Sequence, residues 1–321
     1  MKHTARLPRY ALALGVAWLV ALSVPARAAE PALTVASLST VLSDVARRVG
    51  GERVRVVEIV RPGIDPHEFQ PSPSDVQAVA KADILLISGK GLEGYLAKLE
   101  QSAGGGSAGK FVDVRSKWSD HQYTGGKYVN IGDALGVSLK LQEEGRTVDD
   151  PHWWHSFANV RRATELVQAV FVQADPRNAQ DYATHGAAYV NRLAAAENDV
   201  KLKVAELPRD RRKLVTSHDA FGYLARDYGF TVYPVEGVST SDEPSSRQVA
   251  ALLDTIRREK VKAVFFENTQ NPKVLATITR ETGATVGGEL YADGLGAPDS
   301  DAATYEGMMR HNVETIVNAL K

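Results

Sequence analysis

The sequence predicts an α/β protein of two lobes, each with a four-stranded, mostly parallel sheet flanked by helices, joined by one long rigid helix. Short β-rich apolar runs alternate with amphipathic segments, which is typical of a parallel sheet covered on both faces. A single helical pattern of about 30 residues interrupts this alternation near the middle of the chain, and the alternation then resumes. The 321 residues include no cysteine. Stability must therefore come from packing rather than from disulfides.

The first 28 residues have the pattern of an export signal. The chain begins with a basic segment that extends to Arg9, and an uncharged, mostly apolar run follows at Ala11–Val24. Ala26-Arg27-Ala28 then matches the small-x-small pattern of a cleavage site. The apolar run is too short to span a bilayer, which argues against the alternative of a short membrane anchor. We expect cleavage near Ala28 and a soluble, periplasmic mature protein without a cysteine to carry lipid.

Residues 29–177 are expected to form the N-terminal lobe. The predicted strands are Leu33–Ser37, Val54–Ile59, Ile84–Ser88 and Phe111–Val114, and the predicted helices are Val41–Val49, Ser74–Ala82, Leu92–Gln101 and Phe157–Ala174. Gly104 to Ser107 should form a surface turn. The pattern weakens over residues 116–149, which we interpret as a long, partly ordered loop.

Residues 178–207 are expected to form the linking helix. Its apolar positions recur at spacings of three, four or seven: Tyr182, Tyr189, Leu193, Val200, Val204 and Leu207. At 1.5 Å per residue this helix would be roughly 45 Å long, enough to connect two lobes.

Residues 208–321 are expected to form the C-terminal lobe. Its predicted strands are Leu214–Ser217, Thr231–Val235, Ala263–Glu267 and Thr285–Glu289, with a final helix at Ala302–Leu320. Ser245 is a candidate N-cap for a helix that runs to Glu259.

Asp-Pro-His occurs twice, at Asp65-Pro66-His67 and Asp150-Pro151-His152, in a chain with only eight histidines. Proline restricts its own φ and pushes the preceding residue toward extended conformations, so each histidine leaves a stiff loop. Neutral imidazole is a common zinc ligand, and a ligand ordered in advance loses less entropy on binding. The repeated motif therefore indicates two metal ligands, His67 and His152.

Two further candidates come from the second lobe. His218 and Asp293 follow predicted strands, and ligands of parallel α/β sheets bind at the carboxyl ends of strands. Each lobe thus offers two donors, and the set of three imidazoles and one carboxylate suits tetrahedral zinc. Manganese would more commonly bring additional oxygen donors, and copper(I) would prefer sulfur.

The remaining polar residues leave alternatives open. His155 could be a rival ligand, a partner of a ligand or a surface residue, and His121 could capture metal transiently from the predicted loop. Asp65 and Asp150 could bond the ring N–H of the following histidine or cap a turn. Glu267 could support a ligand or be a buried structural carboxylate. His185 and His311 fall within predicted helices, where packing or surface roles are expected.

The chain resembles the cluster A-I metal-binding proteins of ABC importers over essentially its whole mature length. Four motifs carry the resemblance in order: Gly63 to Asp75, Asp150-Pro151-His152-Trp153-Trp154, Val215 to Tyr223, and Tyr291 to Gly296. It implies metal held in a cleft between two lobes by His67, His152, His218 and Asp293. Manganese-type members are expected to have Glu at the third position, so His218 supports zinc.

The chain departs from the family pattern in three places. His-Trp-Trp-His-Ser replaces the more usual aromatic-Leu-Asp continuation after the second Asp-Pro, Gly294 stands where Ser is common, and His121 is the only histidine between Ser116 and Asp149. This chain is therefore expected to be a zinc-type member without a His-rich loop.

We expect a periplasmic, monomeric zinc-binding protein that delivers Zn²⁺ to an ABC permease subunit in the inner membrane. A net charge of −1 and the lack of a long basic run make nucleic acid an unlikely partner. The alternatives are a manganese importer component, a metal-dependent adhesin or metal chaperone, and a secreted zinc hydrolase. A hydrolase would keep an open coordination position, whereas four protein ligands close the site, and His-Glu-x-x-His is absent.

Overall fold

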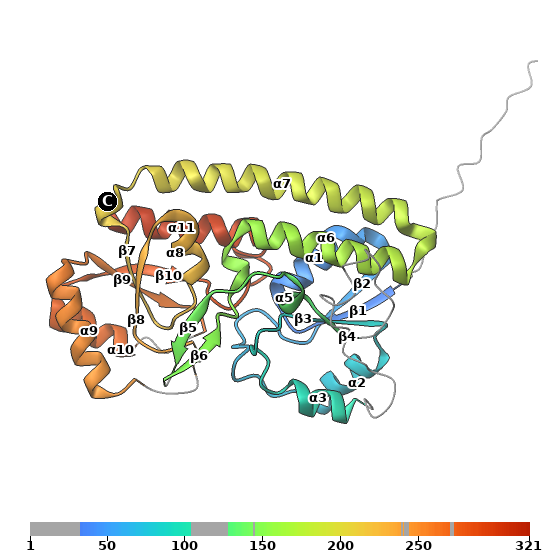
Figure 1. The fold of residues 1–321 in the computed structure, drawn as a ribbon, viewed down its shortest axis with the longest axis horizontal. Coiled ribbons are helices and arrows are strands. Elements are labelled where there is room, and N and C mark those ends of the chain that lie inside the picture. Colours follow the sequence, from blue (N-terminus) through green and yellow to red (C-terminus); the bar gives the residue numbers. More distant parts are fainter. Residues whose placement is uncertain (1–32, 104–127, 144, 239, 241–243, 270–272) are drawn as a thin grey trace, which may run out of the picture.

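The computed structural model describes residues 33–103, 128–143, 145–238, 240, 244–269 and 273–321. Figure 1 shows two lobes side by side, each with its own sheet, and one long helix that runs across both. The predicted signal peptide, the Gly104–Ser107 turn and the strand at Phe111–Val114 lie outside the described residues.

The N-terminal lobe contains a parallel sheet of strand order β2-β1-β3-β4. Its elements are β1 (Leu33–Ser37), α1 (Thr40–Gly50), β2 (Val54–Glu58), α2 (Pro73–Lys81), β3 (Ile84–Ile87), α3 (Leu96–Ser102), β4 (Tyr128–Asn130), α5 (Ile131–Ala134) and α6 (Phe157–Ala174). The strands and helices expected before residue 90 are present within a few residues of their predicted bounds.

Alternate residues of the central strand β3 face two different helical layers. Ile84 and Leu86 belong to the core that includes residues of α1 and α6, whereas Leu85 and Ile87 pack in a second core with residues of α2 and α3. All four side chains are buried because both faces of the sheet are covered, which explains the continuous apolar run.

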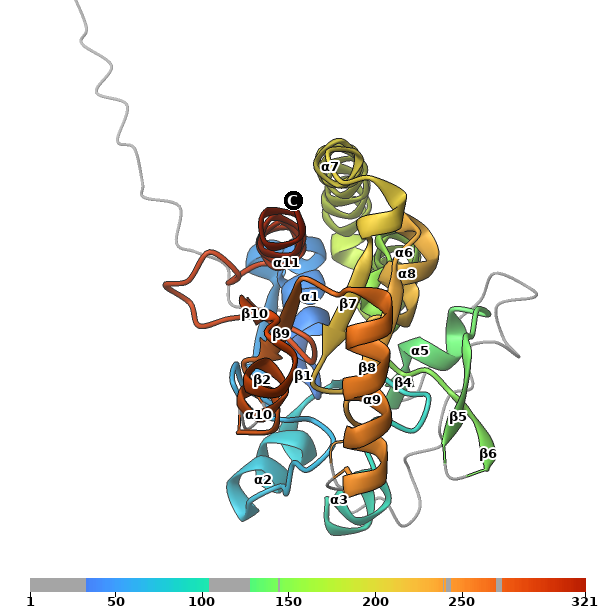
Figure 2. The same ribbon diagram turned by 90° about the vertical axis from the view of Figure 1, so that its left-hand side faces the viewer.

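The predicted loop at 116–149 is wrong for its described part. Tyr128–Asn130 is the fourth strand, and Lys140–Glu143 (β5) pairs antiparallel with Arg146–Asp149 (β6). β4 has only three residues, too few for a periodic pattern, and the hairpin is mostly polar and partly exposed, so neither has the apolar alternation expected of a strand. The hairpin projects from the side of the molecule in Figure 2.

The predicted helix at Leu92–Gln101 begins later, at Leu96. The Glu93 carboxylate accepts hydrogen bonds from the N–H groups of Ser88 (2.6 Å) and Gly89 (3.0 Å). Lys90 has a positive φ of 56°. The hydrogen bonds to Glu93 hold this segment in a turn. A helix cannot run through Lys90, because a right-handed helix requires negative φ.

The linking helix is α7 (Ala179–Ala205), 27 residues long. Its buried positions include Tyr182, Tyr189, Leu193 and Val200, as the predicted spacing requires. In Figure 1, α7 runs along the same side of both lobes, with α6 and α11 beneath it.

The C-terminal lobe contains a second parallel sheet, of order β10-β9-β7-β8. Its elements are β7 (Lys213–Thr216), α8 (Gly222–Tyr228), β8 (Thr231–Pro234), α9 (Ser246–Glu259), β9 (Ala263–Glu267), α10 (Lys273–Thr282), β10 (Thr285–Leu290) and α11 (Tyr305–Leu320). The predicted N-cap is confirmed: the Ser245 side chain accepts from the N–H of Gln248, which completes a capping box.

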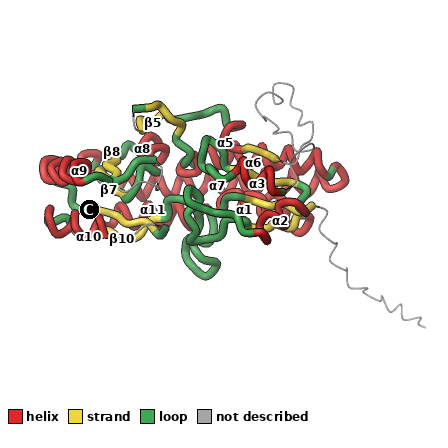
Figure 3. Tube along the Cα trace, turned by 90° about the horizontal axis from the view of Figure 1, so that it is seen from below, coloured by secondary structure: helices red, strands yellow, loops and turns green. Residues whose placement is uncertain are grey.

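One hydrophobic core extends through both lobes. It includes buried residues of β1 and β3 in one lobe, β7 and β9 in the other, and the helices α1, α6, α7 and α11. Figures 1 and 2 show these helices on one side of the sheets and α2, α3, α9 and α10 on the other. Figure 3, seen from below, shows α9 and α10 in one lobe and α2 and α3 in the other. Among the described residues, no helix combines the length and apolar character needed to cross a membrane.

Candidate metal centre

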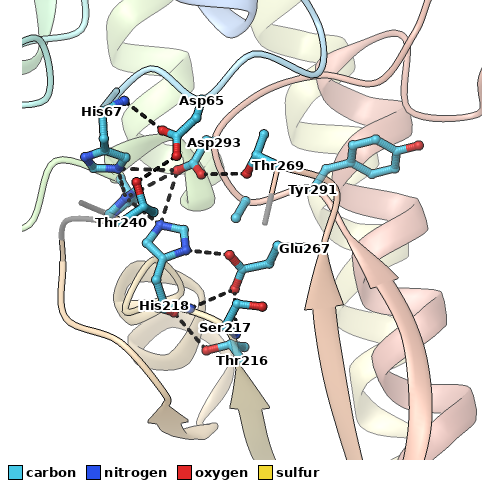
Figure 4. Close-up of polar contacts among 12 residues, drawn as sticks. Asp65, His67, Thr216, Ser217, His218, Thr240, Glu267, Thr269, Tyr291 and Asp293 are labelled. Carbon is cyan, nitrogen blue, oxygen red and sulfur yellow. Dashed lines mark hydrogen bonds and ion pairs between the residues drawn. The ribbon is translucent and has the colours of Figure 1, made fainter. Parts of the chain in front are cut away.

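The first Asp-Pro-His lies in the loop between β2 and α2. Asp65 Oδ1 accepts a hydrogen bond from the backbone N–H of His67 (2.8 Å), and Asp65 Oδ2 accepts one from Thr240 Oγ1 (2.7 Å). Asp65 therefore caps its own turn and also ties the His67 loop to the C-terminal lobe, as Figure 4 shows.

The second Asp-Pro-His follows β6 and is organised differently. Asp150 Oδ1 lies 2.9 Å from the backbone nitrogen of His152 and 2.9 Å from its ring Nδ1. Both residues are fully buried. Asp150 thus takes both of the roles left open by the sequence, and an Nδ1–H donated to the carboxylate leaves Nε2 free to bind a metal.

His218 follows β7, as predicted, and its partner comes from the end of β9. The Glu267 carboxylate bonds the ring Nδ1 of His218 and accepts from the backbone N–H groups of Ser217 (2.9 Å) and His218 (3.2 Å). Glu267 is 1% exposed. It therefore orients His218 with Nε2 directed toward the centre, rather than being only a structural carboxylate.

Asp293 follows β10 and is supported by both lobes. The preceding carbonyl, that of Ala292, accepts from Trp154 Nε1 and His155 Nε2, each at 2.8 Å. Asp293 Oδ2 accepts from Thr269 Oγ1 at 3.2 Å. The segment after the second Asp-Pro-His in one lobe thus fixes the backbone beside Asp293 in the other.

The structure brings the four predicted ligands together at the contact of the two lobes. His152 Nε2 lies 3.2 Å from His67 Nε2 and 3.3 Å from His218 Nε2. Asp293 Oδ1 lies 3.6, 3.5 and 3.3 Å from the Nε2 atoms of His67, His152 and His218. All four donor atoms lie within 4.8 Å of one another. This arrangement can hold a metal ion.

Charge within the cluster favours a bound cation. Burial alone would lower the pKa of His218, but the nearby carboxylates of Glu267 and Asp293 raise it well above its usual value. Burial likewise opposes protonation of His152, yet the hydrogen bonds of Asp150 and Asp293 raise its pKa. Asp293 is desolvated, but the three imidazoles hold its pKa well below the usual range. Without a metal ion, protons therefore supply the positive charge that three buried carboxylates require.

The other histidines lie outside this cluster or outside the described residues. His155 donates to a backbone carbonyl and is fully buried, and burial, with the charge of His152, lowers its pKa to about 4. Its Nε2 is engaged by the Ala292 carbonyl and it lies outside the ligand cluster, so it supports the site instead of competing for metal. His185 and His311 contact backbone carbonyls from α7 and α11. His121 lies in the part of the chain that is not described.

Sequence reasoning assigned no role to two hydroxyl groups of the centre, those of Thr240 and Thr269. Both stand in loops of the second lobe, where threonine is an ordinary surface residue and carries no spacing signal. Only the fold places them beside Asp65 and Asp293.

Replacement of Glu267 by glutamine is expected to lower metal affinity by about 10–100-fold. The amide has a similar shape, but it removes the negative charge that makes His218 basic, and one oxygen cannot serve all the donors that Glu267 now serves. Competition titration against a chromophoric chelator measures the change. Glu259→Gln is the control, because Glu259 pairs with Lys213 on the surface of the same lobe. Equal affinities for the two variants would contradict the role of Glu267.

Two parallel-sheet lobes spanned by one long helix, with a buried cluster of metal-ligating side chains between them, define a metal-binding solute-binding protein. The chain belongs to the family described as ZnuA, zinc-uptake complex component A, periplasmic, whose model matches residues 35–319. It is therefore a metal-binding component of an ABC importer and not an enzyme.

Individual relatives differ in the metal they are named for. The chain is 32% identical over 301 residues to the manganese-binding lipoprotein MntA of Bacillus subtilis (strain 168), covering 92% of each chain. It is 29% identical over 283 residues to the iron-binding protein YfeA of Yersinia pestis, covering 88% of this chain and 84% of that protein. The solved periplasmic zinc-binding protein TroA from Treponema pallidum matches with a TM-score of 0.78 at 28% identity, covering 90% and 99% of the two chains.

Proposed function

We propose that this protein captures Zn²⁺ in the periplasm as a monomer and delivers it to its inner-membrane permease. His67, His152, His218 and Asp293 are the ligands of this proposal, with Zn²⁺ as transported cargo. The observation that carries it is the convergence of three imidazole nitrogens on one carboxylate oxygen at the contact of the lobes.

The spacing of the donor atoms supports zinc. In a regular tetrahedron with zinc bonds of about 2.05 Å, the ligand atoms lie about 3.3 Å apart. Five of the six pairs of donor atoms in the cluster lie between 3.2 and 3.6 Å. The donors thus need little movement to surround a four-coordinate ion.

Manganese is the second candidate, because the similarity to MntA favours it. Manganese commonly takes more oxygen donors. In the cluster formed by the described residues, the protein offers one carboxylate. This donor set is why we place zinc first.

Metal-dependent thermal stability tests the proposal. An ion that binds only the folded protein stabilises it by RT ln(1 + [L]/Kd), about 2.7 kcal/mol at one hundred times Kd. We expect one equivalent of Zn²⁺ to bind the metal-free mature protein and to raise its Tm, with a smaller rise for Mn²⁺ at the same concentration. Unchanged Tm and no bound zinc would refute zinc binding, and a larger effect of manganese would reverse the order of the two metals.

Growth of a deletion strain under zinc limitation tests the transport step separately. We expect poor growth that excess zinc restores, whereas an adhesin with the same metal site would leave growth unchanged. Rescue by manganese alone would favour the manganese importer instead.

A further inference from the structure

The two oxygens of Asp293 lie in different surroundings. Oδ1 faces the Nε2 atoms of His67, His152 and His218 at 3.3–3.6 Å. Oδ2 instead accepts the hydroxyl hydrogen of Thr269 at 3.2 Å. Figure 4 shows Thr269 and His67 on opposite sides of the Asp293 carboxylate. One oxygen is thus presented to the metal position, and the other is held by the protein.

The position of Thr269 follows from β9, the strand that also carries Glu267. One residue beyond Glu267, the chain is fixed to β10 because the N–H of Asn268 bonds the carbonyl of Leu290 (3.1 Å), and Thr269 is the next residue. The end of β9 therefore supports two ligands at once: Glu267 bonds the ring of His218, and Thr269 bonds the side chain of Asp293.

The coordination mode of a carboxylate affects metal preference. A carboxylate bound through one oxygen gives zinc a fourth ligand, which completes its usual tetrahedral shell. Bound through both oxygens, it adds a further oxygen donor, and manganese gains more from additional oxygen donors than zinc does. A group that occupies the second oxygen therefore favours zinc.

We propose that Thr269 is a specificity-determining residue that keeps Asp293 bound through Oδ1 alone and so raises the preference for Zn²⁺ over Mn²⁺. This inference rests on the proposed metal-binding function. Thr269 acts through Asp293 as a positioning residue and does not itself touch the ion.

Thr269→Val tests the hydroxyl group, because valine keeps the shape of threonine but cannot donate a hydrogen bond. Thr269→Ser restores the hydroxyl. Thr279→Val is the matched control, since its hydroxyl bonds only the carbonyl of Ala276 within α10. Dissociation constants for Zn²⁺ and Mn²⁺ are measured for all four proteins by competition titration at one pH.

We expect the ratio of zinc affinity to manganese affinity to fall about tenfold in Thr269→Val. A change of this size is typical when a residue that hydrogen-bonds to a metal ligand is replaced. Thr269→Ser and Thr279→Val should keep the wild-type ratio. The Co²⁺-loaded proteins give an independent readout, because visible d–d absorption weakens as the coordination number of Co²⁺ rises above four. Thr269→Val should absorb more weakly than the wild type, and Thr269→Ser should not.

An unchanged ratio and spectrum in Thr269→Val would overturn the inference while leaving metal binding intact. The same change in both the Val and the Ser variant would also overturn it, because the cause would then be the loop and not the hydroxyl. Failure of the wild-type protein to bind either metal would instead refute the proposed function.

Discussion

The His218→Ala variant is expected to bind zinc more than about 100-fold more weakly than the wild type. This loss exceeds the one expected when only a hydrogen-bond partner of a ligand is removed. The substitution removes one of four donors at a fully buried position, where side-chain exposure is 0%. It also leaves the Glu267 carboxylate without its imidazole partner. Equilibrium dialysis with metal analysis measures the effect directly.

The unpaired Glu267 carboxylate could also destabilise the fold, since breaking a buried ion pair costs about 3–5 kcal/mol. The double variant His218→Ala/Glu267→Gln removes that charge together with the imidazole. We expect it to fold with a Tm near that of the metal-free wild type and still to bind zinc weakly. His185→Ala is the control, because His185 lies in α7, bonds the carbonyl of Val49 and is not part of the ligand cluster. Wild-type affinity in the folded double variant would exclude His218 as a ligand.

The His67→Ala variant should lose less affinity than His218→Ala. The His67 side chain is 6% exposed and lines an open pocket of about 670 Å³. Water can therefore enter and replace the missing nitrogen. At His152 and His218 the surrounding side chains leave no such access, since both side chains are fully buried.

The architecture was predictable where the chain has long, periodic patterns. α6 matches its predicted bounds of Phe157–Ala174, and the buried stripe of α7 predicts its length to within a few residues. β4 and the β5–β6 hairpin were missed, because three residues and a polar hairpin show no periodicity. Their places are determined by neighbours distant in sequence, β4 lying beside β3.

The convergence of the four candidate donors was predictable because each stands beside a local signal, either Asp-Pro or the carboxyl end of a strand. Its supporting contacts were less so. The two Asp-Pro-His copies are identical in sequence, yet Asp150 bonds the ring of its histidine whereas Asp65 reaches across to Thr240. That difference comes from the lobe contact, and no local pattern encodes it.

Zinc affinity is expected to fall steeply as the pH is lowered from about 7.5 to about 5.5, since each imidazole that must release a proton changes the affinity by about tenfold per pH unit. The pKa values of His152 and His218 are raised, so protons already compete with metal near neutral pH. The pKa of Asp293 is held well below its usual value, so its carboxylate stays ionised over this range. The fall in affinity should therefore report the ligating histidines and not the carboxylate.

The stability of the metal-free protein should change with pH in the opposite direction. Histidines with a raised folded-state pKa contribute stability that is fully present below their unfolded pKa of about 6.5 and is lost as pH rises through the folded pKa. This contribution of His152 and His218 shrinks with rising pH while metal affinity grows, so the zinc-induced rise in Tm should be larger at pH 8 than at pH 6.

Glu267→Gln separates the two effects, because loss of the carboxylate lowers the pKa of His218. In that variant the fall in zinc affinity should begin at a lower pH, although the affinity at high pH is already reduced. A zinc affinity that is flat between pH 7.5 and pH 5.5 in the wild type would contradict histidine ligation. An onset that does not move in Glu267→Gln would show that His218 is not the residue whose proton the metal displaces.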